Sequence, residues 1–321
     1  MGYERTDIEG MAGYVYGEQP DDPTVVKLNT NENPYPPSPA VRQALHRFDA
    51  DTLRRYPPAT AEPLRRLVAE RLGVSPEQVV VTNGGDEALR LAITTFVDPG
   101  ATFGSTDPGY SLCPVLAGVL GCAIEAIPVT ADWSVPGDFA RRLNACGAKL
   151  ACVVNPHAPS GTLVDAGTIA ALAGELDGVL LVDEAYVRGH DLTALLADHD
   201  NVLLLRTLSK GYSLAGLRVG FLVGDAGLVD PVLTKTRDSY NVDAIAQALG
   251  AAAYADLDHA RETWRAVRQE RRRLVDERRR RTSSSPKSSA ITRRRRSSTV
   301  SGNAASSCAI STHPAWRRAC A

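Results

Sequence analysis

Short apolar runs alternate with helical patterns between residues 78 and 224, and this alternation constrains the fold more than any other feature. Strands that are apolar along their whole length and separated by helices indicate a mostly parallel sheet with both faces covered. The sequence therefore predicts an α/β fold with functional groups just past the carboxyl ends of the strands. The predicted strands are residues 78–82, 101–105, 122–129, 148–155, 178–183, 201–207 and 218–224.

The segments around the predicted strands differ from them in pattern. Residues 1–60 are rich in Pro, Asn and Tyr, and the prolines of NTNENPYPPSP (residues 29–39) exclude a helix or a central strand there. We therefore expect an irregular, ordered arm. Apolar residues at helical spacing predict helices over residues 62–73, 86–96 and 165–176, and from residue 242 to about residue 281.

Charge is unevenly distributed along the chain. The whole sequence has 36 Lys and Arg against 37 Asp and Glu, a net charge of −1. Residues 278–321 contain 11 of the basic residues and none of the acidic ones, which leaves a balance of −12 for residues 1–277. Residues 282–321 are rich in Ser and lack apolar periodicity, so this segment is predicted to be a disordered tail.

Composition also predicts where the protein works. The first 18 residues have no apolar signal region, and no stretch approaches the roughly 20 apolar residues that span a bilayer. The six cysteines form no C-x-x-C pair and have no His at zinc-ligand spacing. We expect a cytoplasmic protein that binds neither membrane nor nucleic acid and holds no metal. The cysteines are Cys113, Cys122, Cys146, Cys152, Cys308 and Cys320.

The strongest local motif is TLSKGYSLAGLRVG (residues 207–220), which joins two predicted strands. Thr207, Ser209 and Arg218 surround Lys210 with two hydroxyls and a guanidinium, the groups that bind a phosphate monoester. A lysine beside such a cradle can form an imine with an aldehyde cofactor. Taken alone, the motif also fits a solvated loop lysine.

Two further motifs directly follow predicted buried strands. LVDEAY (residues 181–186) ends one strand, where the Asp183 carboxylate is costly unless paired and would suit a protonated pyridine nitrogen. Tyr186 could reach a ring hydroxyl. NPHAPSG (residues 155–161) begins with Asn155, which can donate to a ring oxygen. A helix-capping Asp and an ordinary Pro-rich turn remain the alternatives.

A glycine-bearing turn and an aromatic residue complete the set. TNGGDEAL (residues 82–89) begins a predicted helix, and its backbone N–H groups at Gly84, Gly85 and Asp86 could bind phosphate. Tyr110 follows a strand and a Pro-Gly turn, where it could stack on a flat ring. A structural turn and a packed surface tyrosine are the alternatives.

The order of these motifs resembles that of the histidinol-phosphate aminotransferases, in fold-type I of the pyridoxal-phosphate enzymes (class I/II aminotransferases). The resemblance runs from about Tyr14 to about Glu277. It implies a cytoplasmic homodimer with its active sites at the interface, acting in histidine biosynthesis. The motifs that carry it are NENPYPPSP, RYPPAT, TNGGDEAL, NPHAPSG, VDEAY, TLSKGYSLAGLRVG and YNV.

The resemblance also implies roles for individual residues. Lys210 would hold pyridoxal 5′-phosphate as a Schiff base and shuttle the proton of a ping-pong transamination between an amino donor and a 2-oxo acid. Asp183 would pair with the pyridine nitrogen, and Tyr110 would stack on the ring. Further cofactor contacts are implied for Gly85, Asp86, Asn155, Tyr186, Thr207, Ser209 and Arg218, for Tyr56 in the partner's site, and substrate contacts for Tyr14 and Tyr35.

Two departures from the family pattern stand out. His157 and Ala158 occupy positions where the family usually has two Asn. Near residues 278–282 the composition changes abruptly, which we interpret as a shifted reading frame rather than a functional basic tail. We expect an N-terminal arm with part of a small domain (1–60), a large cofactor-binding domain (61–240), helices leading to an incomplete small domain (241–281) and the tail (282–321).

Three functions remain open from the sequence. The leading one is transamination of L-histidinol phosphate with 2-oxoglutarate. The second is another pyridoxal-phosphate enzyme of the same fold, such as an aromatic amino acid aminotransferase or a threonine-phosphate decarboxylase. The third is a truncated, inactive relative, because no carboxylate-binding Arg of the small domain can be named in this sequence.

Overall fold

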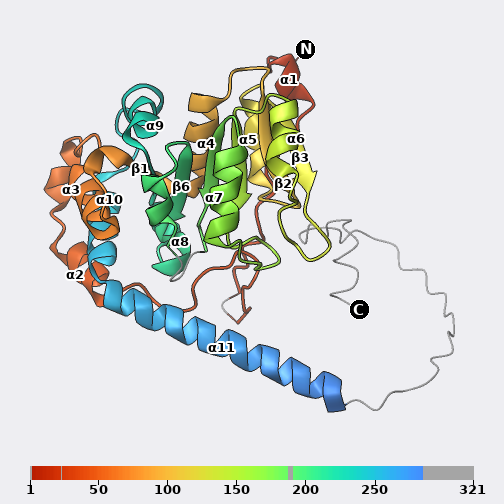
Figure 1. Ribbon diagram of the computed structural model, residues 1–321. Coiled ribbons are helices and arrows are strands. Elements are labelled where there is room, and N and C mark those ends of the chain that lie inside the picture. Colours follow the sequence, from red (N-terminus) through yellow and green to blue (C-terminus); the bar gives the residue numbers. More distant parts are fainter. Residues whose placement is uncertain (1, 23, 187–190, 285–321) are drawn as a thin grey trace.

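The computed structural model describes residues 2–22, 24–186 and 191–284. Within these residues, seven strands form one sheet, in the spatial order β1-β7-β6-β5-β4-β2-β3. Figure 1 shows the sheet at the centre of the protein. All pairs are parallel except those of β7, which runs antiparallel to both β1 and β6. The strands are β1 (Val79–Thr82), β2 (Thr102–Asp107), β3 (Ala123–Pro128), β4 (Leu150–Val154), β5 (Val179–Asp183), β6 (Val202–Thr207) and β7 (Gly220–Gly224).

Helices cover both faces of this sheet, as the uniformly apolar strands predict. In β5, Leu180 and Val182 belong to one core cluster and Leu181 to the other, because successive side chains of a strand point to opposite faces. The first cluster includes residues of α3 (Glu62–Leu72), α6 (Phe139–Ala145), α7 (Ala166–Glu175) and α10 (Ala244–Ala255). The second includes residues of α4 (Gly84–Phe96), α5 (Leu112–Val119) and α9 (Ala226–Pro231).

The predicted helices are confirmed with small shifts at their ends. The helix expected from residue 165 is α7, and Asp165 caps it by accepting a hydrogen bond from the Thr168 N–H at 3.0 Å. The helix expected from residue 86 begins earlier, at Gly84. The long C-terminal stretch is two helices, α10 and α11 (Leu257–Ser284), which separate at Asp256.

The prediction of an irregular segment over residues 1–60 was wrong in part. The segment contains α1 (Thr6–Glu9), α2 (Pro39–Arg47) and a 3-10 turn, η1 (Ala50–Arg54). Pro39 occupies the first turn of α2, where its missing N–H is not needed, so it starts a helix instead of breaking one. Val41 of α2 is buried in the core.

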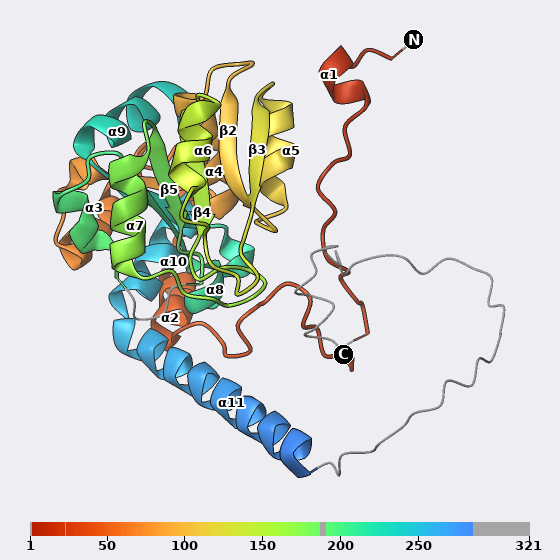
Figure 2. The same ribbon diagram turned by 45° about the vertical axis from the view of Figure 1, so that its right-hand side comes forward.

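The extremities of the described chain lie outside the layered body. Figure 2 shows an extended trace between α1 and α2, and it shows α11 running away from the sheet. None of the helices in the described residues is long and apolar enough to cross a membrane. The predicted tail after residue 284, with Cys308 and Cys320, lies outside the described residues, and Cys113, Cys122, Cys146 and Cys152 are free thiols. The remaining short elements are η2 (Pro76–Gln78), η3 (Thr193–Ala197), α8 (Leu208–Gly211), η4 (Ala215–Leu217) and η5 (Val232–Thr236).

Candidate active site

The reversal of β7 brings the predicted phosphate cradle together. Thr82 ends β1 and Thr207 ends β6, and both are in register with Gly220, the first residue of β7. Because β7 runs the other way, its amino end lies at the carboxyl edge of the parallel strands. Arg218, two residues before β7, is therefore held beside the residues that follow β1 and β6.

Lys210 lies in α8, the short helix that begins directly after β6. Its Nζ donates a hydrogen bond to the carbonyl oxygen of Thr30 at 2.5 Å and lies 5.9 Å from the centroid of the Tyr186 ring. Burial, together with Arg218, lowers the pKa of this amine, and Glu32 opposes the shift. A lowered pKa increases the neutral fraction, the form that can accept a proton or attack a carbonyl.

The turn that carries Lys210 is fixed from two sides. Thr207 caps α8 by accepting from the Ser209 N–H at 3.1 Å. From α11, the Trp264 Nε1–H donates to the Gly211 carbonyl at 2.6 Å, and the Trp264 ring packs edge-on against Tyr212 with 5.7 Å between centroids. These contacts leave little freedom in the backbone around Lys210.

A chain of polar contacts links the cradle residues. The Tyr110 hydroxyl donates to Asp86 Oδ1 at 2.9 Å, and Arg218 Nη2 donates to Asp86 Oδ2 at 3.0 Å. Arg218 Nη1 lies 3.4 Å from Ser209 Oγ, which also accepts from the Thr207 hydroxyl at 2.9 Å. Five of the residues predicted from separate motifs thus meet in one network.

The start of α4 lies beside this network, because the Asp86 side chain belongs to the first turn of the helix. The Asn83 side chain makes no capping hydrogen bond to α4, which leaves the first N–H groups of the helix available to another acceptor. Gly84 has φ +77°, and a Cβ there would lie 2.5 Å from Arg218 Nη2. The positive φ favours glycine at this position, and the start of the helix and the guanidinium lie close together, an arrangement that suits an anion.

Asp183 is a buried carboxylate at the end of β5. Its side chain accepts from the Ala185 N–H at 2.9 Å, and no cation pairs with it among the described residues. Burial raises the pKa of Asp183 to about 6, with a smaller contribution from Asp86. A cationic partner would relieve this cost, because an opposite charge favours the ionised carboxylate.

Asn155 follows β4 as predicted, but its side chain is already engaged. Nδ2 donates to the Val164 carbonyl and Oδ1 accepts from the Val164 N–H, each at 3.0 Å, and the residue is fully buried. One hydrogen of Nδ2 has no partner in this pair. The bonds show that Asn155 closes the 155–164 loop.

Tyr186 and Tyr14 lie beside the central group. The Tyr186 hydroxyl accepts from Asn31 Nδ2 at 3.2 Å. The Tyr14 ring meets the Tyr110 ring edge-on, with 6.5 Å between centroids. Burial, with the Asp86 carboxylate, raises the pKa of Tyr110, so its hydroxyl remains a donor at neutral pH.

Two predicted residues are not joined to this group in the single chain. Tyr35 makes a backbone turn with Asn33, its N–H donating to Oδ1 at 3.2 Å, and no hydrogen bond or ring contact within the described residues links it to Lys210. Tyr56 is 80% exposed and stacks on Tyr240 with 4.4 Å between centroids. It lies at a cavity of about 620 Å³ between η1 and α10.

Sequence reasoning missed the contacts that the arm makes over the lysine. Thr30 and Asn31 lie within NTNENPYPPSP, but nothing in the motif indicates that a backbone carbonyl of the arm accepts from Lys210. Lys27 pairs with Glu32 at 2.7 Å across the same segment. The signal available was the run of Asn and Thr between charged residues, which indicates a turn rich in side-chain donors.

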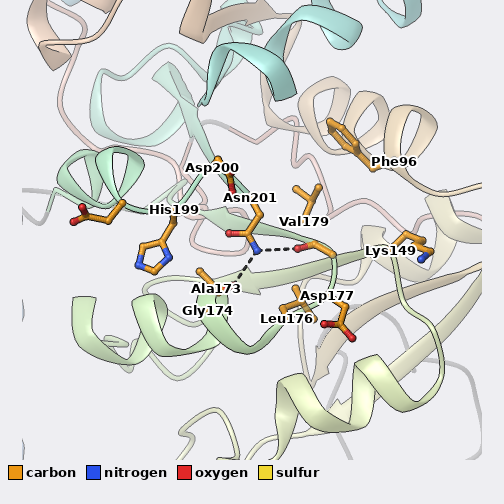
Figure 3. A pocket seen from close by; sticks show the side chains of 12 residues that line it. Phe96, Lys149, Ala173, Gly174, Leu176, Asp177, Val179, His199, Asp200 and Asn201 are labelled. Atoms are coloured by element: carbon orange, nitrogen blue, oxygen red, sulfur yellow. Dashed lines mark hydrogen bonds between the residues drawn. The ribbon is translucent and has the colours of Figure 1, made fainter.

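A second cavity lies at the opposite edge of the sheet. It has a volume of about 550 Å³ and is lined by residues that precede β4, β5 and β6, including Lys149 and Asn201 (Figure 3). Asn201 Nδ2 donates to the carbonyls of Ala173 and Gly178 at 2.9 and 3.0 Å. This cavity is at the amino edge of the parallel strands and contains none of the predicted site residues.

A lysine with a lowered pKa, a buried carboxylate and a cluster of hydroxyl and guanidinium groups meet at the carboxyl ends of the strands, the set that the sequence predicts for a cofactor site. The model of the family described as aminotransferase class I and II matches residues 23–289. The chain belongs to this family, and it is therefore an aminotransferase that depends on pyridoxal 5′-phosphate.

Within this family, the chain is similar to several histidinol-phosphate aminotransferases. Histidinol-phosphate aminotransferase 1 of Nostoc sp. is 42% identical over 272 residues, covering 84% of this chain and 76% of the relative. The histidinol-phosphate aminotransferase of Geotalea daltonii is 40% identical over 270 residues, covering 83% and 76%. The crystal structure of histidinol-phosphate aminotransferase from Sinorhizobium meliloti, in complex with pyridoxal-5′-phosphate, has a TM-score of 0.72 at 26% identity and covers 77% of this chain and 68% of that chain.

Proposed function

We propose that this chain transfers the amino group of L-histidinol phosphate to 2-oxoglutarate, giving imidazole acetol phosphate and glutamate, a step of histidine biosynthesis. The names of the relatives support the substrate. The observation that carries the chemistry is the meeting of the Lys210 amine, the buried Asp183 carboxylate and the Asp86–Arg218–Ser209 network at one edge of the sheet.

The residues present fit pyridoxal phosphate. The cradle at Gly84, where a Cβ would lie 2.5 Å from Arg218 Nη2, suits a phosphate that needs backbone N–H groups and a guanidinium together. Gly85 and Asp86 would supply the N–H groups, and Ser209 and Thr207 lie beside the guanidinium. Asp183, buried without a cation among the described residues, suits the protonated ring nitrogen.

Each residue then has a defined task. When bound, pyridoxal phosphate supplies an aldehyde that condenses with amines and a ring that accepts electrons. Lys210 Nζ, with its lowered pKa, would take the proton from the substrate α-carbon and pass it on within the same half-reaction, so that the neutral amine is available again for the reverse transfer. Asp183 would keep the ring nitrogen protonated, and Tyr110 would stack on the ring. Tyr186 and the free Nδ2 hydrogen of Asn155 are assigned to the ring oxygen, although Asn155 must do so while it holds Val164.

We further propose a cytoplasmic homodimer. Apolar side chains of the arm are largely exposed in the single chain, for example Tyr16 (76%), Val26 (78%) and Leu28 (80%). Tyr56, also 80% exposed, is proposed to reach the cofactor phosphate of the partner, with Tyr14 and Tyr35 near the substrate. The division into an arm (1–60), a cofactor-binding domain (61–240) and connecting helices (241–281) stays a prediction.

The test is product formation by the purified full chain after addition of pyridoxal phosphate. With L-histidinol phosphate and 2-oxoglutarate we expect glutamate. The same assay with aromatic amino acids, and with threonine phosphate while CO₂ is measured, covers the alternative enzymes. Faster turnover of an aromatic amino acid, release of CO₂, or no turnover of any substrate would contradict the proposed substrate.

A further inference from the structure

A buried imidazole connects the loops that follow β2 and β4. His157 is 4% exposed, and its Nε2 lies 2.8 Å from the Pro108 carbonyl oxygen while its Nδ1 lies 2.8 Å from Ser160 Oγ. A carbonyl oxygen can only accept, so Nε2 carries the hydrogen and Nδ1 accepts from Ser160 in the neutral ring. The Thr162 N–H donates to Ser160 Oγ at 3.2 Å, and the Thr162 hydroxyl oxygen lies 3.0 Å from the same oxygen.

The loop around His157 is closed by its own backbone hydrogen bonds. The His157 N–H donates to the Thr162 carbonyl at 2.8 Å, and its carbonyl accepts from the Gly161 N–H at 2.7 Å. The ring of Trp133, from the connection between β3 and α6, lies 5.7 Å from the imidazole. These contacts hold the imidazole in place, so that it can bind the neighbouring loop through the Pro108 carbonyl.

The carbonyl that His157 holds belongs to the turn that presents Tyr110. Pro108 is two residues before Tyr110, and the turn between them is tight, since a Cβ on Gly109 would lie 2.4 Å from the Thr106 carbonyl oxygen. At the far end, the Tyr110 hydroxyl donates to Asp86 at 2.9 Å. The Tyr110 segment is thus held at its start by His157 and at its end by Asp86.

We propose that His157 is a positioning residue for the cofactor site, and that its Nε2–H, through the Pro108 carbonyl, sets the orientation of the Tyr110 ring against bound pyridoxal phosphate. This inference rests on the proposed role of Tyr110. His157 itself contacts the loop and not the reacting atoms. Its effect must therefore pass through Tyr110, whereas a residue that only stabilises the fold would act whether or not Tyr110 is present.

A double-mutant cycle between His157 and Tyr110 separates these two cases. The variant His157→Asn is too short to reach Pro108 but can still bond Ser160, and His157→Gln retains an N–H donor near the position of Nε2. The readouts are the dissociation constant of pyridoxal phosphate, from titration of the full chain, and the circular dichroism of its visible band, which reports the orientation of the bound ring.

We expect His157→Asn to weaken binding about fivefold, as for the loss of one neutral hydrogen bond, and to change the circular dichroism. His157→Gln should restore binding to within about twofold of the wild type. In a Tyr110→Ala background, His157→Asn should add less than about a twofold loss. An equal loss in both backgrounds, no loss at all, or no rescue by Gln would overturn the proposal.

Ser160→Ala is the matched control, because it removes the Nδ1 partner at an exposed residue and leaves the Pro108 bond intact. It should keep the dissociation constant within about twofold, and a fivefold loss would overturn the proposal even if His157→Asn does not fold. Turnover of histidinol phosphate is measured separately. A wild type that binds the cofactor without turning over this substrate would overturn the proposed function and leave the His157 cycle valid.

Discussion

The two edges of the sheet present opposite kinds of polar surface. At the amino edge, a cavity of about 550 Å³ is lined by exposed side chains such as Lys149 and Asp200. At the carboxyl edge, two of the charges are withdrawn from water: Asp183 is 7% exposed, and burial lowers the pKa of Lys210. Keeping a charge out of water is costly, so a protein retains such groups where they have a partner or a task. The comparison indicates that desolvated charge identifies this site better than open volume does.

Among the substitutions that test this comparison, Lys210→Ala should have the largest effect on the transamination rate. Loss of the amine removes both the cofactor attachment and the proton acceptor, so transamination should fall by roughly 10³-fold or more. Lys149→Ala makes the same chemical change at the amino edge and should leave the rate within about twofold. Steady-state rates of the two variants test this. Comparable losses of rate in both would contradict the assignment of the active site to the carboxyl edge.

Asp183→Asn should lower the transamination rate by about 10²-fold, because it removes the charge that keeps the ring nitrogen protonated. In the cofactor-free protein the same change should be stabilising above pH 6. Burial raises the pKa of Asp183 to about 6, so the folded state binds its proton more tightly than the unfolded state. Wild-type stability is therefore lost as pH rises from about 4 to about 6, and the variant lacks this loss.

Urea unfolding of both cofactor-free proteins at pH 4.5 and pH 7.5 measures the Asp183 effect. The variant should gain up to about 2 kcal/mol relative to the wild type between the two pH values. A stability difference that does not change with pH would show that Asp183 is not a desolvated charge in the folded protein.

Ser209→Ala should weaken binding of pyridoxal phosphate by about tenfold, as expected for one hydrogen bond to a charged group. Ser209 lies between Thr207 and Arg218 in the cradle network. Pyridoxal, which lacks the phosphate, provides the control within one protein, because its affinity should not change. Equal losses for both ligands in equilibrium titrations would place Ser209 away from the phosphate.

The smallest effect on cofactor binding is expected for Asn201→Ala at the amino edge. Its side chain bonds the carbonyls of Ala173 and Gly178, so the change should cost roughly 1–3 kcal/mol of stability. The dissociation constant of pyridoxal phosphate should stay within about twofold. Thermal unfolding and cofactor titration of the same sample test both parts, and a tenfold weaker affinity would connect this edge to the site.

Much of the fold could be predicted because it depends on local pattern. Strands such as β5 appear as runs of Val and Leu, and α7 begins at a capping Asp165. The antiparallel direction of β7 could not be predicted, because hydropathy does not encode strand direction. The start of α2 was missed because Pro39 was interpreted as a helix breaker, although at the first turn a proline favours the helix.

In the candidate site too, features that depend on local motifs could be predicted, and contacts between distant residues could not. Lys210, Asp183, Arg218 and Asp86 could be selected from their motifs, because strand ends and glycine turns are visible in the sequence. The bond from Lys210 to the Thr30 carbonyl could not, because it joins residues 180 positions apart through a backbone atom. The hydrogen bond from Asn155 to the Val164 carbonyl also could not be predicted, because it depends on how the loop closes and composition does not determine this.

The central claim is that Lys210 is the amine that holds the cofactor. The direct measurement is borohydride reduction of the full chain after incubation with pyridoxal phosphate, followed by mass-spectrometric mapping of the modified peptide. The account predicts stoichiometric labelling of Lys210, with Lys27, Lys149 and Lys235 unlabelled at the same cofactor concentration. Labelling spread over these lysines, or stoichiometric labelling that persists in Lys210→Ala, would contradict it.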